Sequence, residues 1–390
     1  MTLTTSVTAN YDVTFGDHVL RFGIGSTPQL VDFMRAYFEP SFTFGQAAHG
    51  PAVGWTVTAL IGDCPVPFAE GAATAVDVDR SGGFLRCTGL WVPVAHGRLV
   101  RLLPFGVTVL IEPYRHTITL WGPDEAALRV PCLRVVEDVT THGLERDGWV
   151  HVHASAVVAG GQAVLLCGNK GAGKTSGLCM LLRGFAVTQM ANDNCVLRVV
   201  DGQLVARGWP GFFKVEVATI TRYAELGAHF PASSMHLLGD PAALSDVYDK
   251  VALYPQQGAE GFGVGVVASA PVGCVVFPRF DAARAPRLAP LPVEDLTELF
   301  PQFVQGSRHP NHPDWMDLGA PTARQRDADV AAVVEALRDV ERFTLSWAPS
   351  YEDLLAEVAP LRPFHRGVRA SSRSAATDDT WPPLPRSAPS

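Results

Sequence analysis

Lysine and isoleucine are both scarce in this chain of 390 residues, which contains 4 lysines and 5 isoleucines. Arginine supplies the other 27 of the 31 basic residues. A GC-rich genome explains both shortages, because AT-rich lysine and isoleucine codons drift towards arginine and valine. In such a background a surviving lysine is a candidate for a position that arginine cannot fill. All four, Lys170, Lys174, Lys214 and Lys250, lie in one part of the chain, which is the first place to look for a functional site.

Other shortages exclude whole classes of protein. Charged residues make up only 18% of the chain against 47% hydrophobic residues, which excludes a wholly disordered chain and provides for a sizeable core. The net charge of −8 argues against non-specific nucleic-acid binding, which needs a basic face. Residues 1–15 lack the basic start and apolar centre of a signal peptide. The most apolar stretch, 263–277, is too short and too interrupted by glycine and proline to span a bilayer.

The seven cysteines are widely spaced and odd in number, and none forms a C-x-x-C pair. This pattern does not indicate a disulfide framework. We therefore expect reduced, mostly buried thiols in a cytoplasmic protein. From the charge and hydropathy above, we expect the protein to associate with neither a membrane nor a nucleic acid.

Composition and periodicity divide the chain into four parts. Residues 1–123 are predicted to form a β-rich N-terminal domain, 124–148 a helical connection, 149–365 the main α/β domain, and 366–390 a disordered tail rich in serine, proline and arginine. The predicted fold class is α/β, or α+β overall. Strands are expected at 11–15, 18–22, 54–61, 83–92, 106–111, 116–121, 151–159, 162–167, 185–190, 195–200, 250–254, 273–277 and 342–347, and helices at 27–37, 124–144, 174–183, 328–337 and 351–358.

The segment Gly168–Thr175 reads Gly-Asn-Lys-Gly-Ala-Gly-Lys-Thr and fits the phosphate-loop pattern G-x-x-x-x-G-K-[ST]. Glycine permits positive φ, so successive backbone N–H groups can point at phosphate oxygens, and the helix that follows directs its dipole at the same anion. Lys174 is predicted to contact the β- and γ-phosphates and the Thr175 hydroxyl to bind Mg²⁺. A plain glycine-rich turn is the alternative, but a chain of this composition has only about 0.004 expected random matches.

The loop gives a predicted nucleotide-binding set. Its members are Gly168, Asn169, Lys170, Gly171, Ala172, Gly173, Lys174, Thr175 and Ser176. For Lys170, two alternatives remain equally open: its side chain contacts phosphate, or it only faces solvent.

Two polar positions flank the loop in sequence. His153 begins the run His-Ala-Ser-Ala-Val, 15 residues before Gly168, and Asp193 follows the helix and a strand. An acidic residue there can meet Mg²⁺ or a substrate hydroxyl, although a turn residue at a strand end is the alternative. His153 is a candidate base or phosphate partner, or else a structural histidine. His151 would share its face on a regular strand, but no third ligand with suitable spacing suggests a metal site.

The order of these features resembles HPr kinase/phosphorylase and, more closely, the HPr-kinase-related proteins. A strand led by His153, a hairpin, a phosphate loop, a helix ending in Arg-Gly and a turn similar to Ala-Asp-Asp follow one another. The resemblance covers roughly residues 140–280 and is clearest from His153 to Asp193. It implies a phosphoenolpyruvate-carboxykinase-like nucleotide-binding fold, ATP or another nucleoside triphosphate with Mg²⁺, and phosphoryl transfer to a hydroxyl. The family's tendency to assemble also makes a homo-oligomer an expectation.

The chain departs from the family pattern at one point. The family's Asp-Asp turn supplies a base near the acceptor and a carboxylate near Mg²⁺, whereas this chain has Asn192 followed by Asp193. An amide cannot accept the proton of the acceptor. The resemblance therefore implies that Asp193 acts as the base, as the Mg²⁺ ligand or as both, or that His153 shares the role of base. Loss of phosphoryl transfer is the other consequence that the departure allows.

Two lysines extend the predicted site. Related proteins commonly place a basic residue after a proline in a loop such as Gly208–Lys214, near the phosphates, and Lys250 lies at the start of an expected strand. Both are candidate nucleotide-binding residues, with a surface lysine as the alternative. His309 and His312 belong to a proline-containing segment that we interpret as an exposed loop.

The leading hypothesis is an ATP- and Mg²⁺-dependent kinase acting on a hydroxyl of a peptide or small molecule, in secondary metabolism. Asp193, His153 and Lys174 are its predicted catalytic residues, and Thr175 and Asp193 its metal ligands. A nucleotide-binding regulatory module without transfer, a protein serine kinase, and the reverse phosphorolysis are the alternatives.

Overall fold

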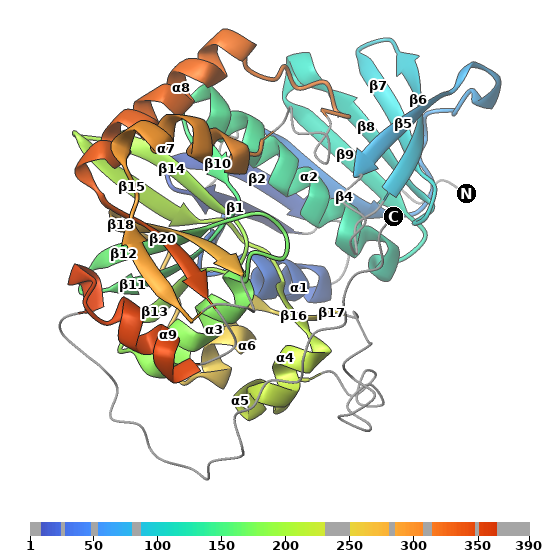
Figure 1. Cartoon of the computed structure of the whole chain (residues 1–390). Coiled ribbons are helices and arrows are strands. Elements are labelled where there is room, and N and C mark those ends of the chain that lie inside the picture. The colour runs from blue at the N-terminus through green and yellow to red at the C-terminus, as the bar shows by residue number, and fades with distance from the viewer. Residues whose placement is uncertain are drawn as a thin grey trace, which may run out of the picture. The chain divides into compact units, whose positions relative to one another are not determined.

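The computed structural model describes residues 9–24, 28–47, 54–79, 87–230, 250–280, 285–306, 314–347 and 351–364. The chain divides into two compact units (Figure 1). The first contains Met1–Trp149 and Gln305–Asp327, and the second contains Val150–Val304 and Ala328–Ser390. The architecture is mixed α/β with several sheets, as expected. The predicted tail at 366–390 and the His309–His312 loop lie outside the described residues.

The first unit is built on a nine-stranded sheet with the order β3-β1-β2-β4-β9-β8-β7-β6-β5. Its strands are β1 (Ala9–Phe15), β2 (His18–Ile24), β3 (Thr43–Gln46), β4 (Thr56–Ile61), β5 (Thr74–Asp79), β6 (Cys87–Val94), β7 (Gly97–Leu102), β8 (Val107–Glu112) and β9 (Thr117–Gly122). The predicted first hairpin is present, with Phe15 opposite His18 across a turn at Gly16, whose φ of 59° suits glycine. The strands β3, β5 and β7 had not been predicted.

Two helices accompany this sheet, α1 (Pro28–Phe38) and α2 (Glu125–Arg146). The Asp124 side chain caps α2 by accepting a hydrogen bond from the Ala127 N–H at 2.8 Å. Alternate residues of β8 are fully buried, which is the period expected of a strand with one face against a core. The short helices of this unit are η1 (Glu70–Ala72) and η2 (Pro113–Arg115).

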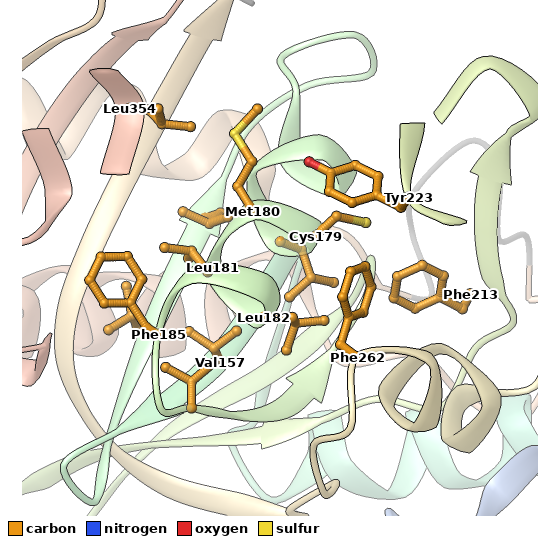
Figure 2. Close-up of a cluster of buried hydrophobic side chains, with 14 of the residues drawn as sticks. Val157, Cys179, Met180, Leu181, Leu182, Phe185, Phe213, Tyr223, Phe262 and Leu354 are labelled. Carbon is orange, nitrogen blue, oxygen red and sulfur yellow. The ribbon is translucent and has the colours of Figure 1, made fainter. Parts of the chain in front are cut away.

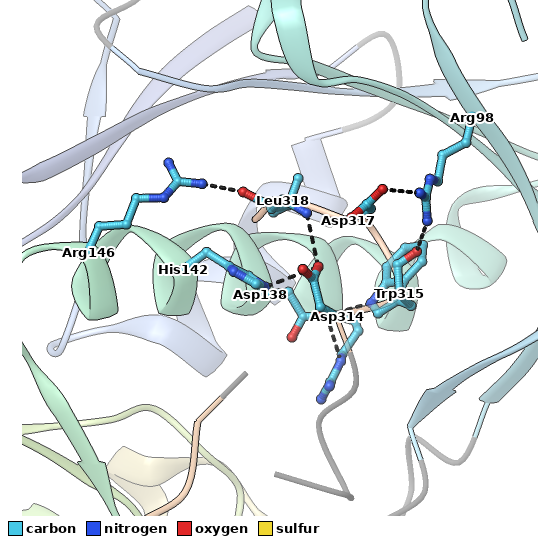
Figure 3. A network of polar contacts seen from close by, with 9 residues as sticks. Arg98, Asp138, His142, Arg146, Asp314, Trp315, Asp317 and Leu318 are labelled. Atoms are coloured by element: carbon cyan, nitrogen blue, oxygen red, sulfur yellow. Dashed lines mark hydrogen bonds and ion pairs between the residues drawn. The ribbon is translucent and has the colours of Figure 1, made fainter. Parts of the chain in front are cut away.

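The segment Gln305–Asp327 belongs to the first unit although the sequence prediction counted it with the main α/β domain. Figure 3 shows the polar contacts that tie it to α2. The Trp315 indole N–H donates to Asp138 at 2.6 Å, and His142 pairs with Asp314 at 3.3 Å. These partners are far apart in sequence, so local patterns gave no sign of them.

The second unit contains a sheet with the order β10-β14-β15-β18-β12-β11-β13, and β20 pairs with both β18 and β19. Its strands are β10 (Val150–Val152), β11 (Ala154–Ala159), β12 (Gln162–Cys167), β13 (Thr188–Ala191), β14 (Cys195–Val200), β15 (Gln203–Gly208), β18 (Ser269–Phe280), β19 (Arg287–Pro290) and β20 (Glu341–Trp347). β12 pairs in parallel with β18, and β18 in parallel with β20. A separate sheet pairs β16 (Phe213–Glu216) with β17 (Lys250–Leu253).

The prediction of one strand over 151–159 was wrong. The chain forms two strands that change partner at His153: β10 pairs with β14, whereas β11 pairs with β12. The His153 backbone N–H donates instead to the Phe303 carbonyl at 2.8 Å. His151 and His153 therefore do not lie on one regular strand.

Helices complete the second unit on both faces of its sheet. They are α3 (Lys174–Gly184), α4 (Val217–Arg222), α5 (Ala224–Gly227), α6 (Pro255–Gly261), α7 (Val293–Leu299), α8 (Ala323–Ala336, which begins in the first unit) and α9 (Tyr351–Val358), with the short helices η5 (Phe300–Phe303), η6 (Leu337–Asp339) and η7 (Arg362–Phe364). None of the helices in the described ranges has both the length and the hydropathy to cross a bilayer.

The alternation of side chains along β12 explains the two cores of this unit. Val164 and Leu166 join a cluster with α3, α4, α5 and α9, part of which is drawn in Figure 2. Leu165 and Cys167 point to the opposite face and join a cluster with α7, η5 and α8. Because both faces of β12 are buried, the end of this strand is a fixed base for the loop that follows it.

Candidate functional site

The glycine-rich loop connects β12 to α3. Gly171 has φ 83° and Gly173, at the N-cap of α3, has φ 90°, both in the left-handed region that favours glycine. The first N–H groups of a helix have no partner within the helix, so the loop and the first turn of α3 offer backbone donors to an anion. Gly168 has a different requirement, because a Cβ there would lie 2.9 Å from the Cβ of Ala172.

Lys174 is buried inside this loop, with 6% of its surface exposed. Its ammonium group donates to the carbonyl oxygens of Gly168 at 2.8 Å and Asn169 at 3.3 Å, and lies 4.0 Å from the Asp193 carboxylate. Burial lowers the pKa of Lys174, and the negative charge of Asp193 partly offsets that effect. The loop therefore holds a fixed cation where the anion of the predicted motif would bind.

Asp193 and His153 form a hydrogen-bonded pair. The His153 Nε2 atom lies 2.9 Å from Asp193 Oδ1. Burial acts to raise the pKa of Asp193, but the hydrogen bond and charge of His153, followed by the charges of Lys174 and Lys214, hold that pKa at about 2. The Asp193 side chain is 46% exposed, so an ionised carboxylate faces both Lys174 and solvent.

The turn that carries Asp193 joins β13 to β14, and the residue before it has a different role. Asn192 is buried, and its backbone carbonyl accepts a hydrogen bond from the Ser155 hydroxyl. Its side-chain amide nitrogen donates to the Phe212 carbonyl at 3.4 Å. Asn192 is therefore bonded to the segment that leads into β16.

Lys214 and Lys250 lie on the paired strands β16 and β17. Lys214 is opposite Ala252 and Glu216 is opposite Lys250, so both lysines project from the same face of this pair. The other face is buried in the core, for example through Phe213. The charge of Lys214 helps to lower the pKa of Asp193, and that of Lys250 adds to the lowered pKa of Lys174. Both cations thus act electrostatically on the pair Lys174–Asp193.

The remaining predicted residues lie in three environments. Asn169 and Lys170 are exposed, whereas Thr175 and Ser176 are partly exposed in the first turn of α3. His151 is buried with its ring 4.8 Å from that of Trp209. Among the described residues no group of three or more His, Cys, Asp or Glu could hold a metal ion.

Sequence reasoning did not select Ser155 or Gln189, which the structure places beside the acidic turn. Ser155 bonds to the Asn192 carbonyl, and the Gln189 amide donates to the Pro255 carbonyl at 3.3 Å. Both side chains are almost fully buried. For Ser155 the available signal was a polar residue within the otherwise apolar strand β11.

No protein-family model matches the chain, and no curated protein matches it. Among solved structures, it is similar to one titled "Structure of the Hpr(Ser) kinase/phosphatase from Coxiella burnetii". The identity is 15% and the TM-score 0.21, with 36% of this chain and 72% of that chain covered. A likeness at this TM-score supports no conclusion about activity.

Proposed function

We propose that the second unit binds a nucleoside triphosphate and transfers its terminal phosphate to a hydroxyl of a peptide or small molecule. The observation that carries this proposal is the position of Lys174. Its ammonium group is buried in a glycine-rich loop between a strand and a helix, 4.0 Å from the half-exposed carboxylate of Asp193. This arrangement provides a phosphate-binding cation beside a group that can orient an acceptor.

The triphosphate would be held mainly by positive charge and backbone donors. The loop amides and the N-terminus of α3 suit the β- and γ-phosphates, and Lys174 neutralises them. Lys214 and Lys250, on one face of the β16–β17 pair, add two cations for the outer phosphate oxygens. Phosphoryl transfer requires chiefly this positioning and charge neutralisation.

The residues present suit Mg²⁺, which prefers oxygen ligands and commonly takes one or two from the protein and others from substrate phosphates. The Thr175 hydroxyl and the Asp193 carboxylate would supply them. A bound Mg²⁺ would neutralise charge on the phosphates.

The pair His153–Asp193 would orient the acceptor hydroxyl. The bond between the γ-phosphorus and the β–γ bridging oxygen breaks, the acceptor oxygen bonds to the γ-phosphorus, and the acceptor proton passes to this pair. A carboxylate with a pKa of about 2 is a weak base, so the proton leaves late, and it passes to Asp193 because the charged His153 that lowers this pKa has no free lone pair. Because the transition state of phosphoryl transfer is loose, the reaction does not require a strong base before the phosphate is transferred.

Lys174→Met tests this proposal, because it removes the cation and keeps most of the side-chain volume. We expect nucleotide binding, measured by calorimetry with ATP and Mg²⁺, to weaken by at least about 100-fold, which corresponds to ~2.7 kcal/mol. Thermal unfolding should be unchanged or slightly raised, since burial of the ammonium disfavours its charged form. Lys170→Met, which removes an exposed cation from the same loop, is the matched control. Equal affinity of the Lys174 and Lys170 variants would refute the proposal.

Nucleotide binding without transfer is the second candidate, and Asn192 is the observation that favours it. This residue occupies the position of an acidic residue in the resembling family and bonds to Phe212 instead. Release of ADP in a screen of hydroxyl acceptors, lost on Asp193→Asn, would support transfer. Tight ATP binding with no turnover in such a screen would favour the binding module.

A further inference from the structure

Two buried amide side chains lie beside the acidic turn, Gln189 within β13 and Asn192 directly after it. Gln189 is 1% exposed and Asn192 7%. Each donates one hydrogen bond to a backbone carbonyl: Gln189 to Pro255 at 3.3 Å and Asn192 to Phe212 at 3.4 Å. Within the described residues, neither amide oxygen has a hydrogen-bond partner.

The two acceptors lie at the same end of the β16–β17 pair. Phe212 directly precedes β16, and Pro255 comes two residues after the end of β17. Phe213 is opposite Leu253 in the register, so the start of β16 and the end of β17 are neighbours. The two amides therefore connect both strands of this pair to β13 and the turn that carries Asp193.

Backbone contacts join the same two regions. The Trp209 N–H donates to the Asn194 carbonyl at 3.0 Å. A Cβ on Gly208 would collide with the Met190 carbonyl, so this close approach requires glycine. The segment before β16 is thus attached to β13 and the acidic turn by backbone contacts as well as by the Asn192 amide.

Burial of an amide with an unpartnered oxygen is unfavourable, and an apolar side chain of the same size would avoid that cost. An amide at each position therefore indicates a need for its donor. The donors reach one end of the β16–β17 pair. Lys214 is the second residue of β16 at that end, and Lys250 begins β17 at the other end. These two cations act on Asp193 and Lys174.

We propose that Gln189 and Asn192 are positioning residues that hold the β16–β17 pair against the Asp193 turn, and so fix Lys214 and Lys250 over the phosphate site. In this interpretation Asn192 acts through Lys214 and is not the remnant of a lost base. The expected effect on nucleotide binding rests on the proposed function, whereas the anchoring of the β16–β17 pair by the two amides does not depend on that function.

The test is a double-mutant cycle on the full chain, with calorimetry of ATP and Mg²⁺ binding. Asn192→Leu keeps the branched shape of the side chain and removes the donor, and we expect about fivefold to tenfold weaker binding. In a Lys214→Met background the same change should weaken binding by less than about twofold, because the cation that it positions is already absent. Gln189→Met should behave in the same way.

Hydrogen exchange of the peptide 209–216 provides a readout that does not need nucleotide. Both variants should exchange faster there than the wild type, and peptide 195–200 on β14 should be unchanged. Gln203→Met, which alters an exposed amide on β15, is the matched control and should leave binding and exchange unaltered.

Additive losses in the cycle, or wild-type exchange in 209–216 in both variants, would overturn the inference. Should one variant fail to fold, the other decides. If the wild type binds no nucleotide, the proposed function fails, and the exchange of 209–216 alone decides whether the amides anchor the strand pair.

Discussion

At the scale of single residues, the candidate site is an arrangement of unlike charges with unequal exposure. Lys174 is buried and bonded to backbone carbonyls, whereas Asp193 is half exposed and bonded to His153. The ammonium group is therefore fixed by the loop, and the carboxylate remains accessible to a substrate. Lys214 and Lys250 add positive charge, so the group of side chains suits an anion with several charges.

The Asp193 carboxylate should make stability depend on pH in acid. Its folded pKa of about 2 is below the ordinary value of 3.8, so its contribution is present above pH 3.8 and is lost as the pH falls towards 2. We expect wild type to be more stable than Asp193→Asn at pH 6, with the difference shrinking between about pH 4 and pH 2. Urea unfolding of both proteins at pH 6, 4 and 3 measures this. A difference that stays constant over that range would contradict the low pKa.

At the scale of elements, the loop from β12 to α3 depends on backbone conformations that only glycine adopts readily. Gly171 and Gly173 both have left-handed φ values. The adjoining elements are rigid, because β12 is buried on both faces and α3 packs into the core through Leu178 and Leu182. The glycine-rich loop therefore connects two elements, β12 and α3, that are each fixed by the core.

Gly173→Ala should weaken both the fold and the site. At φ 90° a Cβ meets its own backbone, which costs about 1–2 kcal/mol, and relief of this strain would move the first turn of α3. We expect a lower melting temperature together with weaker ATP binding. Gly177→Ala is the matched control within the same helix, because there a Cβ would meet only the flexible Leu166 side chain at 3.2 Å. If the two variants melt and bind alike, the left-handed conformation is unimportant.

At the scale of the whole molecule, the chain leaves the second unit after Val304 and contributes Gln305–Asp327 to the first. Figure 3 shows how this return is held. Arg98 donates to the Trp315 carbonyl at 3.3 Å and pairs with Asp317, while Arg146 donates to the Leu318 carbonyl. The first unit is therefore incomplete without residues far along the chain.

Trp315→Phe should destabilise the first unit selectively. It removes the indole donor to Asp138, a carboxylate otherwise held by Arg134 at 3.0 Å, and the loss of one such bond costs about 1–3 kcal/mol. Calorimetric unfolding should show a lower transition temperature, while hydrogen exchange in α3 stays at the wild-type rate below that transition. Trp121→Phe, on β9 of the same sheet, is the control. Equal stability of the Trp315 variant and wild type would show that the contact contributes little.

Much of the fold could be predicted because local patterns determine it. The strand 195–200 and the helix 351–358 have their predicted bounds, and α3 ends one residue beyond the prediction. The break at His153 could not be predicted, because an apolar strand that changes partner has the same local pattern as one that does not. The strands β16 and β17 are short and separated by 33 residues, so only tertiary packing brings them together.

The sequence by itself determined the phosphate-loop pattern, the helix that follows it and the candidate residues, because glycine conformations and side-chain periodicity act over a few neighbours. Only the tertiary structure decided which candidates meet. It joins His153 to Asp193 across 40 positions, encloses Lys174, and turns Asn192 towards Phe212. These contacts depend on the pairing and burial of distant strands, for which no local pattern carries information. The four lysines show the division, because composition drew attention to all of them. The structure places Lys174 and Lys214 where their charges act on Asp193 and Lys250 where its charge acts on Lys174, while Lys170 is exposed.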